Sequence, residues 1–309
     1  MSWQPWREAW RQALYGPAGF YLHAEPQQHF RTSVHASPLF AASILRLVRR
    51  SGLSAVTDYG AGSGELLTQL AHLAPDLVLT GIDLRPRPID LPASIGWRHE
   101  LPDDISGLLF ANELLDNVPC QVVELDPRGV VRIVEVDSVS GAERLGSEAA
   151  DAETRWLDDW WPLELAGDRA EVGLDRDEFW EDACGRVVSG MSLALDYGHL
   201  QADRPTTTTL RSYRLGRETP VRLDGTADVT AHVAVDSVAA AVRASVRRQR
   251  DMLHELGVSA IRPPLPLAST DPAAYVRGLA QASQAAELVD SPGLGDLYWL
   301  LAEHSTDTG

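Results

Sequence analysis

Lysine is absent from the sequence: in a chain of 309 residues, all 27 strongly basic side chains are arginines. This absence excludes catalysis through a lysine Schiff base, and it also excludes the phosphate-binding lysine of a Walker loop. Arginine and histidine are therefore the only basic side chains available to a functional site.

Cysteines and long apolar segments are also scarce. Cys120 and Cys184 are too few and too far apart for a metal site or a disulfide framework, which indicates a reducing compartment. No run approaches the ~18 apolar residues of a membrane span, and Arg7 and Glu8 stand where a signal peptide would need its apolar segment. We therefore expect a cytoplasmic protein with neither a metal ion nor a membrane partner.

The charge of the chain is one-sided. A formal net charge of -17 at pH 7 repels phosphate backbones, and no basic patch that would offset it is evident in the sequence. We therefore expect no nucleic-acid partner. A cationic or neutral substrate fits this charge better.

Hydrophobic periodicity predicts the first half of the fold. Trp3, Trp6, Trp10 and Leu14 recur at helical spacing and predict a helix that ends at Gly16-Pro17. Strands and helices then alternate, as is typical of a doubly wound parallel sheet. The expected elements are a helix at 37–50, strands at 54–59, 78–83 and 107–112, and helices at 64–73 and 113–117.

The alternation breaks after residue 119. Apolar runs at 122–125 and 130–136 flank Asp126-Pro127-Arg128-Gly129 and predict a β-hairpin, and the acidic, tryptophan-bearing stretch 147–185 predicts a helical lobe. The remaining expectations are a strand at 192–197, a loop-rich stretch at 199–232, helices near 236–256 and 272–288, and a final strand at 296–302. The chain thus divides into an N-terminal helical extension (1–50), a core (51–119 and 191–309) and an inserted hairpin and helical lobe (120–190).

The stretch DYGAGSG, residues 58–64, joins a predicted strand to a predicted helix. Gly60, Gly62 and Gly64 permit positive φ and a close approach of backbone to a ligand, and the following helix offers free N–H groups. A dinucleotide-binding turn reads G-x-G-x-x-G, whereas this turn reads D-x-G-x-G-x-G. The spacing favours S-adenosylmethionine over a nicotinamide dinucleotide.

Two carboxylates accompany this turn. Asp83 ends the next predicted strand, where a carboxylate binds the ribose hydroxyls of either cofactor. Asp58 suits the amino-acid end of S-adenosylmethionine and would repel a diphosphate, although a strand-end aspartate that only caps the turn is the alternative.

Six stretches of the sequence resemble conserved blocks of one family, in the same order. The family is the class I S-adenosylmethionine-dependent methyltransferases of the group that includes the mitochondrial complex I assembly methyltransferase and its bacterial relatives. The blocks are ALYGPAGFY (13–21), HFRTSVHASPLF (29–40), VTDYGAGSGEL (56–66), LLFANELLDNVP (108–119), LALDYG (193–198) and DGTADVTAHV (224–233).

The resemblance implies a Rossmann-like methyltransferase sheet, S-adenosylmethionine as the cofactor and a protein arginine side chain as the methyl acceptor. Two departures stand out: Val34-His35 replaces the family's Pro-Glu, and Asp58-Tyr59 stands where glutamate is common. The first departure follows Thr32 and Ser33, where contacts to the substrate or to the methionine end of the cofactor are expected.

The end of the fourth strand is where this fold places the reacting groups. Asn112 and Glu113 occupy that end, with Asp116 three residues after Glu113. On a helix this spacing puts both carboxylates on one face, where they could bind a guanidinium together. The alternative is that Asp116 only caps the helix.

Further candidate contacts lie elsewhere in the blocks. Glu100 and Leu101 could line an adenine pocket, or they could belong to a solvated loop. The resemblance suggests substrate contacts at Tyr197, Asp228, Thr230 and His232, although His232 could equally be structural.

Other functions stay open at this point. A small-molecule methyltransferase and a non-catalytic S-adenosylmethionine-binding assembly factor both fit the fold. A nucleic-acid base is disfavoured, because the chain lacks the [DN]-P-P-[YF] turn with which amino-methyltransferases of nucleic acids stack their target.

The glycine spacing makes a direct prediction. The purified chain should bind S-adenosylmethionine or its demethylated product in the micromolar range and should bind NAD weakly. Isothermal titration calorimetry measures both affinities, and tighter binding of NAD would contradict the interpretation of the turn.

Overall fold

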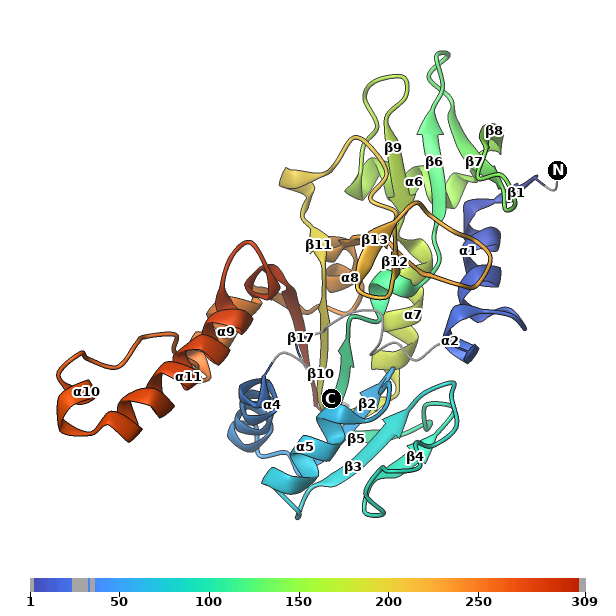
Figure 1. The fold of residues 1–309 in the computed structure, drawn as a ribbon. Helices are drawn as coiled ribbons and strands as arrows, with labels where there is room; N and C mark the ends of the chain where they lie inside the picture. Colours follow the sequence, from blue (N-terminus) through green and yellow to red (C-terminus); the bar gives the residue numbers. More distant parts are fainter. Residues whose placement is uncertain (1–2, 24–32, 34–36, 306–309) are drawn as a thin grey trace. The chain divides into compact units, whose positions relative to one another are not determined.

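A computed structural model of the chain describes residues 3–23, 33 and 37–305, and it divides into two compact units. The first unit comprises residues 1–30, 113–186 and 196–244, and the second comprises residues 31–112, 187–195 and 245–309. Figure 1 shows the elements of both. The three-part division expected from the sequence stays a prediction.

The second unit contains a seven-stranded sheet, counted over the described residues, with the order β16-β17-β10-β5-β2-β3-β4. Parallel pairing joins β10 to β5, β5 to β2, β2 to β3 and β3 to β4, whereas β16 and β17 pair antiparallel. The strands are β2 (Ala55–Tyr59), β3 (Val78–Ile82), β4 (Gly96–Arg98), β5 (Ile105–Asn112), β10 (Val187–Asp196), β16 (Ser245–Arg248) and β17 (Tyr298–His304).

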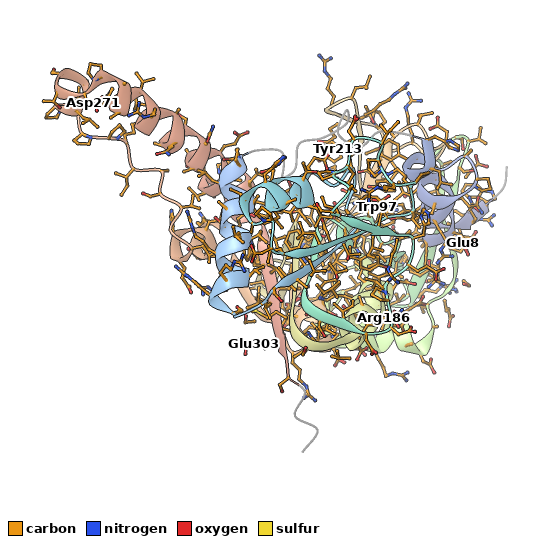
Figure 2. The ribbon with its side chains drawn as sticks, turned by 90° about the horizontal axis from the view of Figure 1, so that it is seen from below. Glu8, Trp97, Arg186, Tyr213, Asp271 and Glu303 are labelled. Atoms are coloured by element: carbon orange, nitrogen blue, oxygen red, sulfur yellow. The ribbon has the colours of Figure 1, made fainter. Side chains whose placement is uncertain are left out.

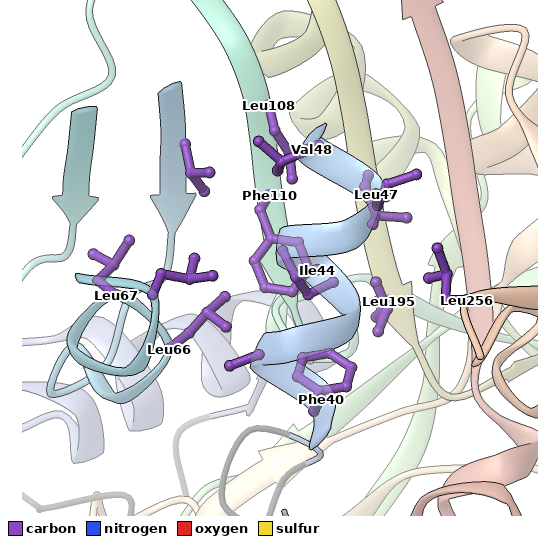
Figure 3. Close-up of a cluster of buried hydrophobic side chains, with 14 of the residues drawn as sticks. Phe40, Ile44, Leu47, Val48, Leu66, Leu67, Leu108, Phe110, Leu195 and Leu256 are labelled. Atoms are coloured by element: carbon purple, nitrogen blue, oxygen red, sulfur yellow. The ribbon is translucent and has the colours of Figure 1, made fainter. Parts of the chain in front are cut away.

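Four helices share one apolar core with this sheet: α4 (Pro38–Arg50), α5 (Glu65–Leu73), α9 (Gln249–Glu255) and α11 (Pro272–Val289). α4 begins where the Ser37 hydroxyl accepts from the Leu39 N–H group at 3.1 Å, with Pro38 in the first turn. Its apolar face meets α5 and β5, as Figure 3 shows for Phe40, Ile44 and Phe110. The predicted helices at 37–50 and 64–73 are confirmed, and the second of them joins β2 to β3 as expected.

The C-terminal helices extend from this sheet. Figure 1 shows the short α10 (Leu267–Thr270) and the adjoining part of α11 reaching away from the strands of the unit. Asp271, labelled in Figure 2, begins α11 by accepting from the Ala274 N–H group at 2.9 Å. Apolar side chains at Ile261, Leu265 and Val276 are exposed along this projection.

The first unit is built on a second sheet, in the order β1-β7-β6-β9 with β8 paired to β7. Its strands are β1 (Trp3–Pro5), β6 (Gln121–Leu125), β7 (Val131–Asp137), β8 (Glu143–Glu148) and β9 (Arg169–Val172). The predicted hairpin is confirmed: β6 and β7 pair antiparallel, and Asp126 Oδ1 accepts from the Arg128 and Val130 N–H groups at 2.8 and 2.9 Å.

Five α-helices and five short strands complete the described part of this unit, together with short 3₁₀ turns. They are α1 (Trp6–Tyr15), α2 (Phe20–His23), α6 (Asp151–Trp160), α7 (Leu174–Gly185) and α8 (Val235–Ala241), with β11 (Gly198–His199), β12 (Arg211–Arg214), β13 (Arg217–Thr219), β14 (Asp228–Thr230) and β15 (Val233–Ala234). The last residue of β10, Asp196, also belongs to this unit. Trp6, Trp10 and Leu14 of α1 lie in one core with strands β6 and β7, so the N-terminal helix and the hairpin bury each other's apolar faces.

Three sequence-based assignments are wrong. Trp3 lies in β1, where it pairs with Asp137 of β7, so the first helix begins only at Trp6. The helix expected at 113–117 is a 3₁₀ turn at Leu115–Asn117. The helix expected near 236–256 is interrupted, because residues 245–248 pair with β17 and this pairing overrides the local helical pattern.

Within the described ranges, none of the helices is both long enough and apolar enough to cross a membrane.

Arg176 of α7 is the most heavily bonded buried side chain of the first unit. Its guanidinium donates to the backbone oxygens of Asp116 at 3.1 Å, Val118 at 3.3 Å, Ala231 at 3.1 Å and His232 at 2.7 Å. The side chain is 1% exposed. It therefore ties the turn after β5 to the segment that contains β14 and β15.

Replacing this arginine should destabilise the chain. In Arg176→Met, the backbone oxygens lose a charged donor while staying buried, so the free energy of unfolding should fall by about 3–5 kcal/mol. Urea unfolding followed by circular dichroism measures the change. Arg186→Met is the matched control, because Arg186 directly follows the same helix (Figure 2) and its ion pair with Asp182 is exposed. Loss of this ion pair should lower the free energy of unfolding by about 0–1 kcal/mol. Equal effects of the two changes would contradict the role of Arg176.

Candidate functional site

The glycine turn of the second unit forms as predicted. After β2 ends at Tyr59, the N–H groups of Gly60 and Ala61 donate to the Ile82 oxygen of β3 at 2.9 and 3.0 Å. The φ angles of Gly60, Gly62 and Gly64 are 79°, 62° and 78°, and Gly64 caps the start of α5. These left-handed angles explain why glycine is required along the turn.

Gly62 and Gly64 differ in what surrounds them. A Cβ at Gly64 would lie 2.5 Å from Leu91 Cδ1, so this glycine is needed for packing. At Gly62 the nearest atoms would be Glu65 Oε2 at 3.6 Å and Arg85 Nη2 at 3.8 Å, which are ordinary contacts with charged side chains. Gly62 is therefore the glycine that brings backbone next to charged groups rather than next to the core.

Asp83 lies beside the turn, where the sequence predicted it. Its Oδ2 accepts from the Gly62 N–H group at 2.9 Å, and its Oδ1 accepts from the Arg85 N–H group at 2.9 Å and from Arg85 Nε at 3.1 Å. The carboxylate thus holds the glycine turn in place and pairs with Arg85. A ribose that binds Asp83 would have to displace the Arg85 side chain from it.

Asp58 is buried behind the turn, and its environment is acidic. Burial, followed by the charges of Glu65 and Asp83, raises the pKa of Asp58 to about 8. Three carboxylates around one turn favour a cationic ligand and disfavour a diphosphate. S-adenosylmethionine carries an ammonium and a sulfonium group, so it fits this charge.

The residues predicted to line an adenine pocket lie just beyond β4. Trp97 of β4 donates through Nε1 to the Arg85 oxygen at 3.1 Å, and His99 Nδ1 lies 3.1 Å from the Asp83 oxygen. The strand end is therefore next to Asp83. Glu100 is exposed and Leu101 is half-buried, and their contact with adenine stays a prediction.

The first unit holds an acidic cluster of its own, formed by Glu113, Asp116, Asp196 and Asp228. Asp196 is fully buried, and its Oδ2 accepts from the N–H groups of Leu115 at 2.8 Å and Asp116 at 3.1 Å. Burial raises the pKa of Asp196, and the charges of Asp116 and Glu113 raise it as well. Asp196 is thus the residue that positions the turn carrying the predicted catalytic groups.

The predicted helical geometry of Glu113 and Asp116 is wrong. Glu113 has a φ of 52°, so it precedes the 3₁₀ turn in a left-handed conformation and shares no helix face with Asp116. Its carboxylate instead forms a hydrogen bond with the Tyr197 hydroxyl. Asn112 is the last residue of β5, directly before it. The sequence was right that these residues are neighbours, but Asp196 rather than helical spacing brings the carboxylates together.

Asp116 and Asp228 are both buried and electrostatically linked. Asp116 Oδ1 accepts from Asn117 Nδ2 at 2.7 Å, and burial raises the pKa of Asp116 to about 7 although Arg176 lowers it. Asp228 Oδ1 accepts from the Tyr21 hydroxyl at 3.0 Å, and burial followed by the charge of Asp116 raises the pKa of Asp228 to about 8. Buried acids with raised pKa values mark a candidate functional site.

The other predicted substrate contacts are Thr230 and His232, which follow Asp228 in the first unit, Ser33 in the second unit, and Thr32. His232 is exposed, with its ring centroid 6.4 Å from that of His199, and Thr230 is half-buried on β14. Ser33 of the second unit is buried, and its hydroxyl forms hydrogen bonds with Gln249 at 3.2 and 3.3 Å. Thr32 and the departure at Val34-His35 lie outside the described residues.

Sequence reasoning missed the two tyrosines of the first block. The Tyr15 hydroxyl donates to the Asn117 backbone oxygen at 3.1 Å, and its ring stacks on that of Tyr21 at 5.6 Å. A Cβ at Gly225 would lie 2.1 Å from the Ala18 oxygen, so the first and last blocks are in contact. The sequence contained a signal for these contacts, because the two tyrosines of ALYGPAGFY flank a glycine- and proline-containing turn, and tyrosine hydroxyls that are buried usually find a hydrogen-bond partner.

Comparisons with known proteins identify the family of the chain. The family model described as "Putative S-adenosyl-L-methionine-dependent methyltransferase" matches residues 68–252, more than half of the chain. None of the curated proteins matches.

Solved structures show the same fold. A "likely methyl transferase" from Burkholderia thailandensis, bound to S-adenosyl-homocysteine, is 24% identical with a TM-score of 0.79, covering 98% of this chain and 88% of that chain. A second structure of an uncharacterized protein from the same organism is 24% identical with a TM-score of 0.78, covering 98% and 87%. A 1,6-didemethyltoxoflavin-N1-methyltransferase from this organism is 11% identical, covers 87% and 79%, and has a TM-score of 0.37, which is too low to bear on the substrate.

The raised pKa of Asp58 predicts how cofactor affinity depends on pH. A bound ammonium or sulfonium group lowers this pKa, so binding releases a proton from a group that titrates at about 8 in the free protein. Affinity should therefore rise from pH 6 to pH 8, by at most about tenfold per pH unit, and level off above.

Calorimetry in buffers of different ionisation enthalpy measures both the affinity and the released proton. Asp58→Asn should remove the pH dependence. Asp76→Asn is the control, because Asp76 is exposed and pairs with Arg49 in the same unit, and it should leave the dependence intact. A parent protein whose affinity is constant over this range would contradict the assignment of Asp58.

Proposed function

The chain belongs to the S-adenosyl-L-methionine-dependent methyltransferase family whose model it matches, and on this premise we propose that it methylates a guanidinium nitrogen of an arginine side chain in a protein. The cofactor supplies an electrophilic methyl group on a sulfonium. The substrate supplies the nitrogen lone pair that attacks it.

The cofactor half of the proposal rests on the second unit. The proposed doubly wound arrangement is supported by the strand order, in which β3 lies on one side of β2 and β5 on the other. In such sheets, ligands bind at the carboxyl ends of the strands where the order reverses. The glycine turn follows β2 at that point, and the proposal assigns Asp58 to the ammonium group and Asp83 to the ribose.

One observation carries the substrate half: Asp116, Asp196 and Asp228 of the acidic cluster are buried, and among the described hydrogen bonds none joins their carboxylates to an arginine. Arg176, the nearest buried cation, donates to backbone oxygens instead. Buried carboxylates of this kind are stabilised by a cation that supplies both charge and N–H donors. A guanidinium offers both in a planar array.

The residues of the cluster have distinct tasks in this proposal. Glu113, oriented by Tyr197, holds the guanidinium and accepts the proton that the methylated nitrogen releases. The carbon–sulfur bond breaks as the carbon–nitrogen bond forms, and its electron pair stays on sulfur. Asp196 touches neither reactant and acts as a positioning residue, because it binds the backbone of the turn.

The decisive experiment is a methyl-transfer assay. The purified chain is incubated with radiolabelled S-adenosylmethionine and a lysate of its host, and the labelled products are identified by mass spectrometry. Methylarginine in a protein supports the proposal. Label on the oxygen or carbon of a metabolite would replace it with a small-molecule methyltransferase, and a cofactor-binding chain that labels nothing would favour a non-catalytic assembly factor.

Glu113 should matter for turnover and not for cofactor binding. Glu113→Gln keeps the shape and removes the proton acceptor, so the methylation rate should fall on the order of 10²-fold while S-adenosylmethionine affinity changes little. Glu135→Gln, which breaks a partly exposed pair with Arg144 in the same unit, is the control and should retain the parent rate. Parent-like turnover of the Glu113 variant would remove this residue from the mechanism.

A further inference from the structure

Asn117 carries an acceptor without a donor inside the acidic cluster. The residue is 5% exposed, and its Nδ2 donates to Asp116 Oδ1 at 2.7 Å and to the Glu113 oxygen at 3.3 Å. Its Oδ1 has no hydrogen-bond partner among the residues that the structure describes. A buried amide oxygen in this state is destabilising unless a ligand or water donates to it.

The orientation of this amide is fixed by its neighbours. If its oxygen and nitrogen were exchanged, the oxygen would face a carboxylate oxygen and a backbone oxygen, both of which are acceptors. The nitrogen therefore lies toward Asp116 and Glu113. The oxygen is presented as an acceptor beside the carboxylate.

The surroundings add further acceptors and a partly open wall. Tyr15 donates to the Asn117 backbone oxygen, its ring stacks on Tyr21, and Tyr21 donates to Asp228. Both tyrosine residues are half-buried, so part of each is exposed at the surface beside the cluster. Because both tyrosine hydroxyls already donate to the protein, the remaining demand of the cluster is for N–H donors.

The proposed function, on which this step rests, asks for a cation but does not separate arginine from lysine. A carboxylate binds an ammonium or a guanidinium equally through charge. A neutral amide oxygen beside the carboxylate adds little charge but accepts one more N–H group. The planar guanidinium has N–H donors for the carboxylate and the amide oxygen at once, whereas the donors of an ammonium group diverge from one nitrogen.

We propose that Asn117 is the specificity-determining residue of the site, and that its Oδ1, together with the carboxylates of Asp116 and Asp228, selects a guanidinium over an ammonium group.

The test measures binding rather than turnover, on the full chain saturated with S-adenosyl-homocysteine. The probes are N-acetyl-arginine methylamide, its lysine counterpart and its citrulline counterpart, titrated by calorimetry. The parent protein should bind the arginine probe at least about tenfold more tightly than the lysine probe, as expected for one added hydrogen bond to a buried group, and should bind the neutral citrulline probe most weakly. Equal affinity for the arginine and lysine probes overturns the proposal without any variant.

The variant Asn117→Leu keeps the side-chain size and removes the acceptor. It should lower the affinity for the arginine probe to that for the lysine probe and leave the lysine affinity within about twofold of the parent. Gln121→Leu is the matched control, since Gln121 is also a buried amide of the first unit whose Oε1 has no partner among the described residues. It should leave the arginine preference intact, and equal loss in both variants would overturn the role of Asn117.

Folding of each variant is checked by circular dichroism, and the comparison of probes on the parent protein decides the matter if Asn117→Leu fails to fold. The outcomes also separate this inference from the proposed function. If the parent protein methylates arginine in the lysate but binds the arginine and lysine probes equally, the role of Asn117 is contradicted and the proposed function stands. If the parent protein prefers the arginine probe through Asn117 but methylates a metabolite in the lysate, the proposed function is contradicted and the role of Asn117 stands.

Discussion

The pair of hydrogen bonds that Asp196 accepts from Leu115 and Asp116 is the interaction on which the candidate site depends. It holds the chain in a tight turn directly after β5, with Glu113 in a left-handed conformation before it. Without this carboxylate the N–H groups of the turn would need another buried acceptor. The same two bonds that order the backbone also bring a third acidic group beside Glu113 and Asp116, so the geometry of the site and its charge have one origin.

The charge balance of the first unit explains why the cluster stays acidic. Arg176 lies beside the turn, yet its N–H groups donate to backbone oxygens of the turn and of the segment at Ala231 and His232. It therefore ties the segments together while leaving the carboxylates of Asp116 and Asp228 to compete for protons, which is why burial can raise their pKa values. An arginine bonded directly to those carboxylates would neutralise the groups that a cationic substrate needs.

The sequence predicted the parts of the site that are local in the chain. The glycine turn, Asp58 and Asp83 follow from spacing along consecutive elements, because a strand, a turn and a helix are set by neighbouring residues. Arg176 and Asp196 could not be placed in this way, since their partners lie 55 to 81 residues away. The helical assignment of 113–117 failed for the same reason: Asp196 supplies the acceptor that makes a 3₁₀ turn after a left-handed residue stable.

The two units share one physical feature, which is that each buries aspartate side chains whose pKa values are raised by burial. Asp58 in the second unit and Asp116, Asp196 and Asp228 in the first have pKa values raised by burial. For folding alone this is unfavourable, because such groups hold protons in the native state that they lose in the unfolded chain above pH 4 or so. Their contribution to stability therefore falls as pH rises toward about 8, which is the pKa of Asp58 and of Asp228. Acidic groups that weaken the free protein and are relieved by a bound cation are characteristic of sites shaped by binding rather than by stability.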